Sequence, residues 1–466
     1  MEVIHIQQIK QAQKYLNNNN KSDSAKLKNI TNGIAVKFTN RKNDDIDNDY
    51  MDNETKRYEL AEAKNAVKYM EHCVQKIKYI VDKNPAKPKD YDAWTNEEQY
   101  KHITENIKIY VPNLPNSLYY FVSAALHRGD CGRSPTDRPP WLDMDKFRRG
   151  QKFARDYIFI ILFSNMISLF ELFAFTDDLK PLIFSQQSHT PYLAFRRYLS
   201  TIRRIRNWMM GDIWEKDTQA YKDIQAVRKM HRAIRLKLCQ LDYDEIDAAT
   251  KIQEPWCPDR KTILDDFFSC PYPTPENGCF HLIIRPKGLN QADMSATQFA
   301  FMGMIVLYPQ KLGINASDED ITAYCHFWRC IGYALGMQDE YNFCRGSLEE
   351  IRQRGQDITN VWVKPYLRQI TPEWEHMLRC IMSICDEDNM FKQSLLFITD
   401  LLDIDMPRLR STLTFSQRLQ FMLHRFIFRY ALKVRFIREC FNKIFLQILE
   451  KFTSKKLGTL PNKYNI

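Results

Sequence analysis

The chain has 466 residues, of which 44% are hydrophobic, and it carries a formal net charge of +10. Only 14 glycines stand against 28 phenylalanines, which argues against a β-sandwich or barrel with its many glycine-marked turns. Because 67 Lys and Arg face 57 Asp and Glu, we expect a mixed, solvated charged surface and no nucleic-acid site. The composition therefore favours an all-α protein with a bulky interior.

The cysteines and the N-terminus bear on the compartment. None of the 12 cysteines forms a C-x-x-C pair, so a zinc ribbon is not expected. Residues 1–13, MEVIHIQQIKQAQ, contain no apolar signal segment. Both features predict an intracellular, reducing environment.

The N-terminal quarter of the chain divides by composition. Residues 16–56 are rich in Lys, Asp and Asn and have too few large apolar side chains to offset chain entropy, so we predict a disordered, low-complexity N-terminus over 1–56. Apolar residues at three- and four-residue steps predict a helix over 55–81. Residues 83–97 are predicted to be a linker, and 57–114 form a helical N-terminal extension.

The next strong signal is the apolar segment 155–175, RDYIFIILFSNMISLFELFAF, which follows a Pro- and Gly-bearing loop at 127–143. It is nearly long enough to span a bilayer. Ser164, Asn165, Ser168 and Glu171 interrupt it, and each polar group is costly in lipid. We therefore predict one buried core helix, with a membrane span and an interfacial helix as the alternatives.

Five further helices are predicted over 191–212, 217–241, 293–312, 318–337 and 347–356. Ser317 with Asp320, and Ser347 with Glu350, are spaced to cap the last two of these helices. The Pro-rich stretch 255–290 is predicted to be a long surface excursion.

The C-terminal extension, 361–466, contains a segment at 415–451 with neither Pro nor Gly, which predicts one long helix. Basic residues alternate there with large apolar ones, a composition that suits an anionic membrane surface. We expect a peripheral membrane contact through 415–452. The alternative is a helix docked on the core with its basic residues turned to water.

The histidines limit the possible metal chemistry. The ten of them include no H-E-x-x-H or H-x-H pair, so a zinc or non-haem iron cage is not expected. One axial imidazole is enough when iron is held by a porphyrin. In VRKMHRAIRLKL (227–238), His231 has Arg228 three residues before it and Arg235 four after, on one helix face. Such arginines would disfavour imidazole protonation and leave a lone pair for iron. The alternative is a solvated surface histidine.

FRRYLST at 195–201, followed by VRKMHRAIR at 227–235, resembles the latex clearing protein (rubber oxygenase) and MpaB catalytic-domain family. The members of that family are largely α-helical haem b oxygenases with a globin-related core. The resemblance covers about 115–360 and includes FWRCIGYALGMQDE at 327–340. It implies the catalytic residues Arg197 and Thr201, the iron ligand His231, and the cofactor-binding arginines Arg228, Arg235 and Arg329.

Two departures from the family pattern narrow the expected activity. Ser200 stands where the rubber-cleaving members have a distal lysine, and Glu171 is the nearest candidate for their glutamate base. The resemblance therefore implies a haem b-dependent oxygenase that takes dioxygen and an apolar alkene, isoprenoid or lipid rather than rubber. It also implies association with the endoplasmic reticulum membrane. A non-catalytic haem-binding or membrane-associated helical protein, and a helical scaffold without a cofactor, remain the alternatives.

Overall fold

The structure is a computed structural model that describes residues 48–270, 287–383 and 387–454. Every regular element in those ranges is a helix, and the one β-type pairing described there is an isolated antiparallel bridge between Arg128 and Asn290. The predicted all-α fold class is confirmed.

The chain forms two compact units. The smaller unit comprises residues 1–110 and 235–242, and the larger comprises 111–234 and 243–466. The predicted domain boundaries at residues 56, 114 and 360 stay predictions.

The smaller unit is built on the long helix α3 (Asn48–Asp82). The predicted helix is confirmed, but it begins seven residues early, inside the segment predicted to be disordered; the rest of that segment lies outside the described residues. Val67, Met70, Val74 and Ile77 form a buried stripe on α3, and α4 (Asn96–Glu105) packs against this helix. The unit also contains η1 (Tyr91–Ala93), α5 (Ile107–Tyr110) and the last turns of α12.

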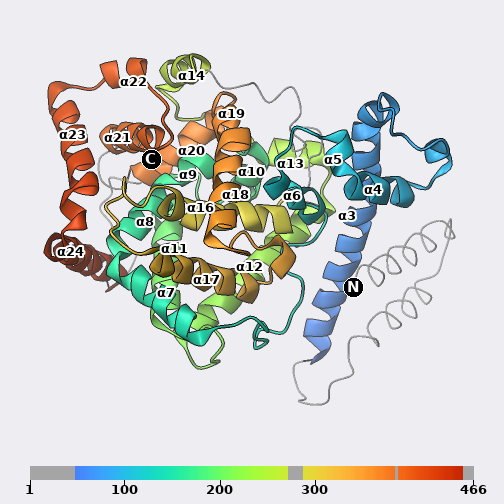
Figure 1. Cartoon of the computed structure of the whole chain (residues 1–466), viewed down its shortest axis with the longest axis horizontal. Coiled ribbons are helices and arrows are strands. Elements are labelled where there is room, and N and C mark those ends of the chain that lie inside the picture. Colours follow the sequence, from blue (N-terminus) through green and yellow to red (C-terminus); the bar gives the residue numbers. More distant parts are fainter. Residues whose placement is uncertain (1–47, 271–286, 384–386, 455–466) are drawn as a thin grey trace. The chain divides into compact units, whose positions relative to one another are not determined.

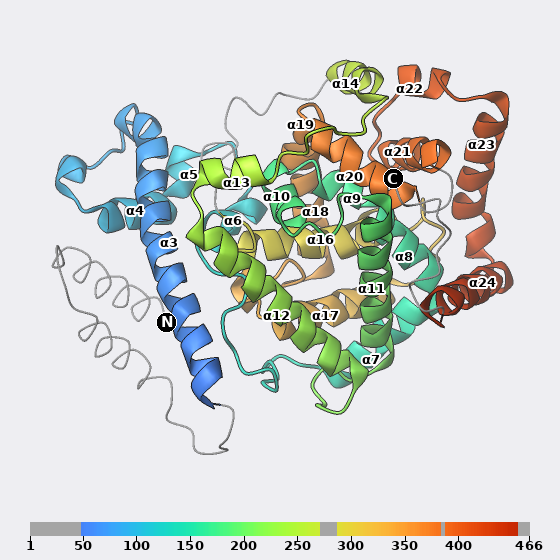
Figure 2. The ribbon, with the colours of Figure 1, turned by 180° about the vertical axis from the view of Figure 1, so that it is seen from behind.

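The larger unit is organised around α16 (Gln291–Leu307), which lies in its middle in both views (Figures 1 and 2). Thirteen of the 17 residues of α16 are buried, as expected for a helix that is covered on all sides. The helices that pack against it are α6 (Tyr120–Ala124), α8 (Ile158–Ile167), α9 (Leu169–Leu172), α17 (Asp318–Ala334) and α18 (Leu348–Ile358).

Beside this centre, α17 packs closely along α7 (Met144–Asp156). Gly150 permits the approach, because a Cβ there would lie 2.2 Å from the carbonyl oxygen of Ala323. The remaining elements of the first three quarters of the unit are η2 (Asn116–Leu118), α10 (Thr176–Phe184), α11 (Pro191–Met210), α12 (Gln219–Gln240), α13 (Tyr243–Ala249), η4 (Asp339–Tyr341), η5 (Thr359–Val363) and α19 (Lys364–Leu367).

All five helices predicted between residues 191 and 356 are present, as α11, α12, α16, α17 and α18. Their caps follow the predicted pattern. The Ser317 side chain accepts a hydrogen bond from the backbone N–H of Asp320, and Ser347 forms a reciprocal capping box with Glu350.

The prediction of one continuous helix over 155–175 is wrong. The segment is divided among the end of α7, then α8 and α9, with breaks at Tyr157 and Ser168. Asn442 supports the first break, because its side chain accepts from the N–H of Phe159 and donates to the carbonyl of Asp156. A distant helix thus satisfies the backbone groups that the break leaves free.

The same segment is mostly buried, as predicted, with Ile160, Ile161 and Leu162 almost inaccessible to solvent. Within the described ranges, no individual helix has the length and apolar character needed to cross a membrane. Two consecutive helical segments, 144–156 and 158–172, are long and apolar enough when taken together, but they are bent by 82° relative to each other.

The stretch 255–290 is not wholly irregular, because it contains α14 (Arg260–Phe268); residues 271–286 lie outside the described part. The buried carboxylate of Asp266 anchors α14, accepting hydrogen bonds from the N–H groups of Arg408 and Leu409. Those two residues belong to the short helix α22 (Pro407–Ser411). This long-range contact has no counterpart in the local sequence pattern.

The C-terminal part of the unit contains α20 (Pro372–Met382), α21 (Glu387–Leu401), α23 (Phe415–Arg429), η6 (Ala431–Lys433) and α24 (Arg435–Ser454). The single helix predicted over 415–451 is wrong, because the chain bends after Arg429. The bend coincides with the burial of Leu432 and with the close approach of Gly313 to the Phe428 carbonyl. At the bend, local backbone bonds from Lys433 to Tyr430 and from Val434 to Ala431 replace the α-helical pattern.

Candidate functional site

The two helices that carry five of the six predicted site residues, α11 and α12, are joined through their polar side chains. Thr190 caps α11 by accepting from the N–H of Leu193, and Pro191 starts the helix. The amide of Asn207 on α11 donates to the carboxylate of Asp223 on α12 over 2.7 Å. This bond ties the C-terminal end of α11 to the N-terminal part of α12.

His231 lies on α12 and is only half-buried by area, yet burial is the main cause that lowers its pKa to about 4. The charge of Arg197 lowers the pKa further, and the charge of Asp130 acts the other way. In the part of the chain that the structure describes, the buried Nδ1 of His231 has no hydrogen-bond partner. The imidazole is therefore neutral near pH 7 and has an unused buried nitrogen, which is uncommon in folded proteins.

Arg197, on α11, is half-buried, and its guanidinium is held by hydroxyl groups. Its Nη1 donates to Ser185 Oγ over 3.0 Å and to Ser188 Oγ over 3.2 Å. Burial lowers the pKa of its guanidinium. Among the residues that the structure describes, no carboxylate pairs with Arg197, so its charge lacks a counterion of the usual kind.

The structure therefore brings Arg197 and His231 together from two helices, 34 positions apart in the sequence. The expectation that flanking arginines keep the imidazole neutral needs a correction. The cation that acts on His231 is Arg197 of α11, because Arg228 is turned toward a carboxylate.

Thr201 lies one turn after Arg197 on α11 and is half-buried. Its hydroxyl donates to the carbonyl oxygen of Arg197 over 3.1 Å, a bond within the helix. The hydroxyl proton is thus committed to the backbone, while the oxygen can still accept a hydrogen bond.

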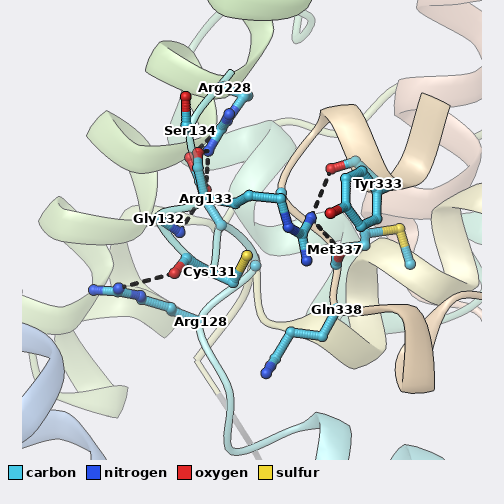
Figure 3. A network of polar contacts seen from close by, with 12 residues as sticks. Arg128, Cys131, Gly132, Arg133, Ser134, Arg228, Tyr333, Met337 and Gln338 are labelled. Atoms are coloured by element: carbon cyan, nitrogen blue, oxygen red, sulfur yellow. Dashed lines mark hydrogen bonds and ion pairs between the residues drawn. The ribbon is translucent and has the colours of Figure 1, made fainter. Parts of the chain in front are cut away.

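Arg228 is held in a buried ion pair with Asp130, with hydrogen bonds of 3.0 Å from Nε and 2.6 Å from Nη2. Its Nη2 also donates to the carbonyl of Arg133 over 2.8 Å (Figure 3). Burial acts to raise the pKa of Asp130, but the hydrogen bond and charge of Arg228 outweigh it and leave that pKa below its usual value. The paired charges compensate each other inside the protein.

The loop that supplies Asp130 is itself clamped onto the end of α17. Arg133 donates to the carbonyls of Tyr333 and Met337 over 3.0 and 3.1 Å, and its guanidinium lies 3.6 Å from the centre of the Tyr333 ring (Figure 3). Cys131 adds a backbone bond to Gly336. These contacts make the surroundings of Arg228 a well-connected structural network.

The two remaining predicted arginines also have carboxylate partners. Arg235 donates from Nε and Nη2 to Glu62 over 2.8 and 3.0 Å. Arg329 donates in the same way to Asp339 over 2.9 and 2.6 Å, and its guanidinium lies 3.9 Å from the centre of the Trp141 ring. The roles of Arg235 and Arg329 as cofactor-binding cations stay predictions. In such a role each guanidinium would have to divide its hydrogen bonds between the cofactor and its present carboxylate partner.

Glu171, on α9, is buried, and burial raises the pKa of its carboxyl to about 8. It is therefore mostly protonated at pH 7, unlike an ordinary glutamate. Across the described ranges, no group of three or more His, Cys, Asp or Glu side chains could hold a metal ion directly.

No protein-family model matches the chain, and no curated protein matches it. Among solved structures, the chain is similar to "Structure of Latex Clearing Protein LCP in the closed state". That similarity has a TM-score of 0.42 and 16% sequence identity, over 74% of this chain and 88% of that one. A likeness this distant establishes neither a family nor a function, so function has to be inferred from the side chains.

A bound haem b group would need an iron ligand and cations for its propionates, and the described side chains meet the first of these two needs. His231 offers a neutral imidazole with an unpartnered nitrogen, which suits an axial iron ligand. Arg197 offers a cation without a carboxylate partner for an anionic group. Arg228 and Arg329 do not offer free cations, because carboxylates already hold them. The ligand position fits, whereas the propionates would find few free cations among the predicted arginines, since carboxylates hold Arg228, Arg235 and Arg329.

Three residues that shape the site were not predicted from the sequence, namely Asp130, Ser185 and Ser188. All three lie in loops or at helix ends, where Asp and Ser are common for local reasons. Asp130 stands in the predicted loop 127–143, close in sequence to the arginines of that loop. An acidic residue among arginines was the sequence feature that could have indicated an ion pair.

Proposed function

We propose that this protein is a haem b-dependent oxygenase that uses dioxygen on an apolar alkene, such as an isoprenoid or another lipid. The observation that carries the proposal is the environment of His231. A neutral imidazole with an unused buried nitrogen lies beside an uncompensated guanidinium, and both features are costly unless a ligand completes them. The spacing of Arg197, Thr201 and His231 in the haem-oxygenase motif supports the same assignment.

In this proposal His231 would hold the iron. With a pKa of about 4, its imidazole keeps a free lone pair throughout the neutral range. Haem b, when bound, supplies the activation of dioxygen needed to attack a carbon–carbon double bond.

Arg197 and Thr201 would act on the polar groups of the bound ligands. Ser185 and Ser188 fix the guanidinium of Arg197, so its positive charge is already oriented where negative charge develops. The Thr201 hydroxyl donates its hydrogen bond to the Arg197 carbonyl, so its oxygen would serve as an acceptor. Large apolar residues on α8 and α16 would surround the substrate, which suits a ligand without charge.

A haem-binding protein without turnover is the second candidate, and one observation favours it. The Thr201 hydroxyl donates within its own helix, so it is not free to donate to bound oxygen. Ser200 likewise offers no amine at the position of the distal lysine in the rubber-cleaving members.

The test uses the full chain, purified and reconstituted with haem b. An absorption spectrum with iron quantification measures binding, and an oxygen electrode measures turnover with an isoprenoid alkene as substrate. A Soret band together with alkene-dependent oxygen consumption is the expected result. A Soret band without oxygen consumption would favour the second candidate, and the lack of any Soret band would contradict both.

A further inference from the structure

Helices α23 and α24 carry most of the large apolar side chains that remain exposed. Sixteen large hydrophobic residues are exposed in the described part of the chain, and eleven of them lie between residues 415 and 452. These eleven, here called the apolar face, are Phe415, Leu419, Met422, Leu423, Phe426, Tyr430, Val434, Phe436, Ile444, Ile448 and Phe452. Scattered exposed hydrophobics are normal on a soluble protein, but a concentration on two adjacent helices indicates an interaction surface.

On α23 the exposed residues follow one another at helical steps. Phe415, Leu419, Met422 and Phe426 are separated by three or four positions, so they line one side of the helix. The other side is docked, because Phe428 is buried and its ring lies 4.5 Å from that of Phe163. The helix therefore has two apolar sides. One side packs against the core, and the described residues leave the other side uncovered.

The following helix, α24, has the same division. Asn442 fastens it to the break between α7 and α8, and Leu449 is buried. On its free side Phe436 is 75% exposed and Ile444 is 56% exposed. Figures 1 and 2 show α23 and α24 joined end to end at the margin of the larger unit.

Basic side chains accompany this apolar face. The segment 415–452 contains eight Lys and Arg residues against only Glu439 and Glu450. Arg425 and Arg429 pair with Asp400 on the docked side, and Arg435 pairs with Glu439. Lys443 is exposed and forms no ion pair with any described residue. The segment thus has an excess of six positive charges that the chain compensates only in part.

We propose that the apolar face of α23 and α24 docks on the surface of an anionic lipid bilayer. Apolar side chains of a surface helix reach the boundary between headgroups and acyl chains, while Lys and Arg remain among the lipid phosphates. A second copy of the chain fits less well, because two such faces would bring two basic segments together. This surface is independent of the proposed haem chemistry.

Sedimentation of the full chain with vesicles tests the proposal. Two vesicle types are compared, phosphatidylcholine alone and phosphatidylcholine mixed with phosphatidylserine. The expected result is strong sedimentation with the mixed vesicles and much less with the neutral ones, and the difference should shrink at high salt. Equal binding to both vesicle types, or binding to neither, would overturn the proposal.

A triple variant, Leu419→Gln, Met422→Gln and Phe436→Gln, tests the apolar contribution. All three side chains are more than half exposed, so the fold should be retained, as circular dichroism and thermal unfolding would verify. The partition coefficient for mixed vesicles should fall by roughly tenfold or more. Met210→Gln on α11 is the matched control, because Met210 is 61% exposed outside the apolar face. Should the triple variant misfold, Phe436→Gln alone provides the comparison.

A charge variant separates the electrostatic contribution. Lys443→Gln should weaken binding to mixed vesicles by about fivefold and leave binding to neutral vesicles unchanged. Lys216→Gln, at an exposed lysine outside the segment, should have no effect on either. The proposal is wrong if the triple variant sediments like the wild type. It is also wrong if light scattering shows a wild-type dimer that the triple variant converts to a monomer, since the face would then join two copies.

Discussion

Two residues one turn apart on α12, Arg228 and His231, have opposite surroundings. Arg228 satisfies its guanidinium with both oxygens of Asp130 and with the Arg133 carbonyl. His231 keeps a buried nitrogen without a partner, and the nearby Arg197 disfavours its protonation. The first arrangement is complete without any other molecule. The second is incomplete, and an incomplete buried polar group is a reason to look for a ligand.

The same contrast separates the arginines. Arg329 donates twice to Asp339 and covers the ring of Trp141, whereas Arg197 is held by two serine hydroxyls. Carboxylates stabilise a buried guanidinium far better than neutral hydroxyls do. Arg197, which no described carboxylate holds, is also the cation whose charge lowers the pKa of His231.

The largest effect is expected for His231→Ala. If His231 is the iron ligand, the variant should fold but retain little haem, because the protein would lose the side chain that would hold the iron. The absorption spectrum and iron content measure this, and added imidazole should restore part of the Soret band. His189→Ala is a demanding control, since His189 also has a buried Nδ1 without a partner in the described residues. Full haem content in His231→Ala would refute the assignment, and loss of haem only in His189→Ala would transfer it to that residue.

Arg228→Ala should act mainly on stability. Removing the guanidinium leaves the carboxylate of Asp130 buried without its partner, which typically costs about 3–5 kcal/mol in the free energy of unfolding. Haem retention should weaken without being abolished. Denaturant unfolding measures the loss, and a double-mutant cycle with Asp130→Asn should recover most of it. Arg329→Ala, whose pair is more exposed, should cost about 1 kcal/mol or less. Equal losses in the two variants would show that the burial of the Arg228 pair has no energetic consequence.

The pH dependence of the haem-free chain should reveal the burial of His231. The pKa of the His231 imidazole is about 4 in the folded chain, below its ordinary value of 6.5. As the pH falls, the unfolded chain therefore binds this proton at a higher pH than the folded chain does. The stabilisation from the neutral imidazole is present above pH 6.5 and is lost progressively toward pH 4, by roughly 2 kcal/mol between pH 7 and pH 5.

The comparison is between wild type and His231→Ala, each unfolded by urea at both pH values. Glu171, with a pKa raised to about 8, should lower stability as the pH rises from about 4.5 to 8. That slope is common to both proteins and cancels in the difference. A wild type that loses no more stability than the variant on acidification would show that the imidazole is not buried in the neutral form.

Arg197→Ala and Thr201→Ala should change the haem content least. Both variants should retain haem, while turnover should fall by roughly a hundredfold for Arg197→Ala, as for other oriented donors near developing charge. Arg196→Ala changes an exposed neighbour on the same helix and should leave turnover unaltered. If either variant loses haem completely, that residue anchors the cofactor and does not act on bound oxygen.

Local patterns in the sequence were sufficient for most of the helices. The apolar periodicity of α11 and α12 and the caps at Ser317 and Ser347 act within a few residues, so the sequence alone determines them. The same holds for the placement of Arg197 and Thr201 on one side of α11. Such features need no knowledge of the rest of the chain.

Helix continuity was decided by tertiary contacts. The apolar segment 155–175 has no Pro or Gly to mark its breaks, and Asn442, more than 280 residues away in the sequence, supports the break at Tyr157. The division of 415–451 into α23 and α24 likewise accompanies the burial of Leu432. Periodicity measures which side of a helix is apolar, but it carries no information on where a distant side chain replaces a backbone hydrogen bond.

The site itself shows the same division between local and long-range causes. The sequence by itself determined that His231 and its arginines lie on helices, but tertiary structure decided which arginines are free. Asp130 and Glu62, 98 and 173 residues from their partners, hold Arg228 and Arg235. Arg197 comes to act on His231 only because the fold brings α11 near α12, where Asn207 donates to Asp223. Charge compensation depends on distance in space, and distance in space between remote residues is set by the packing of the whole chain.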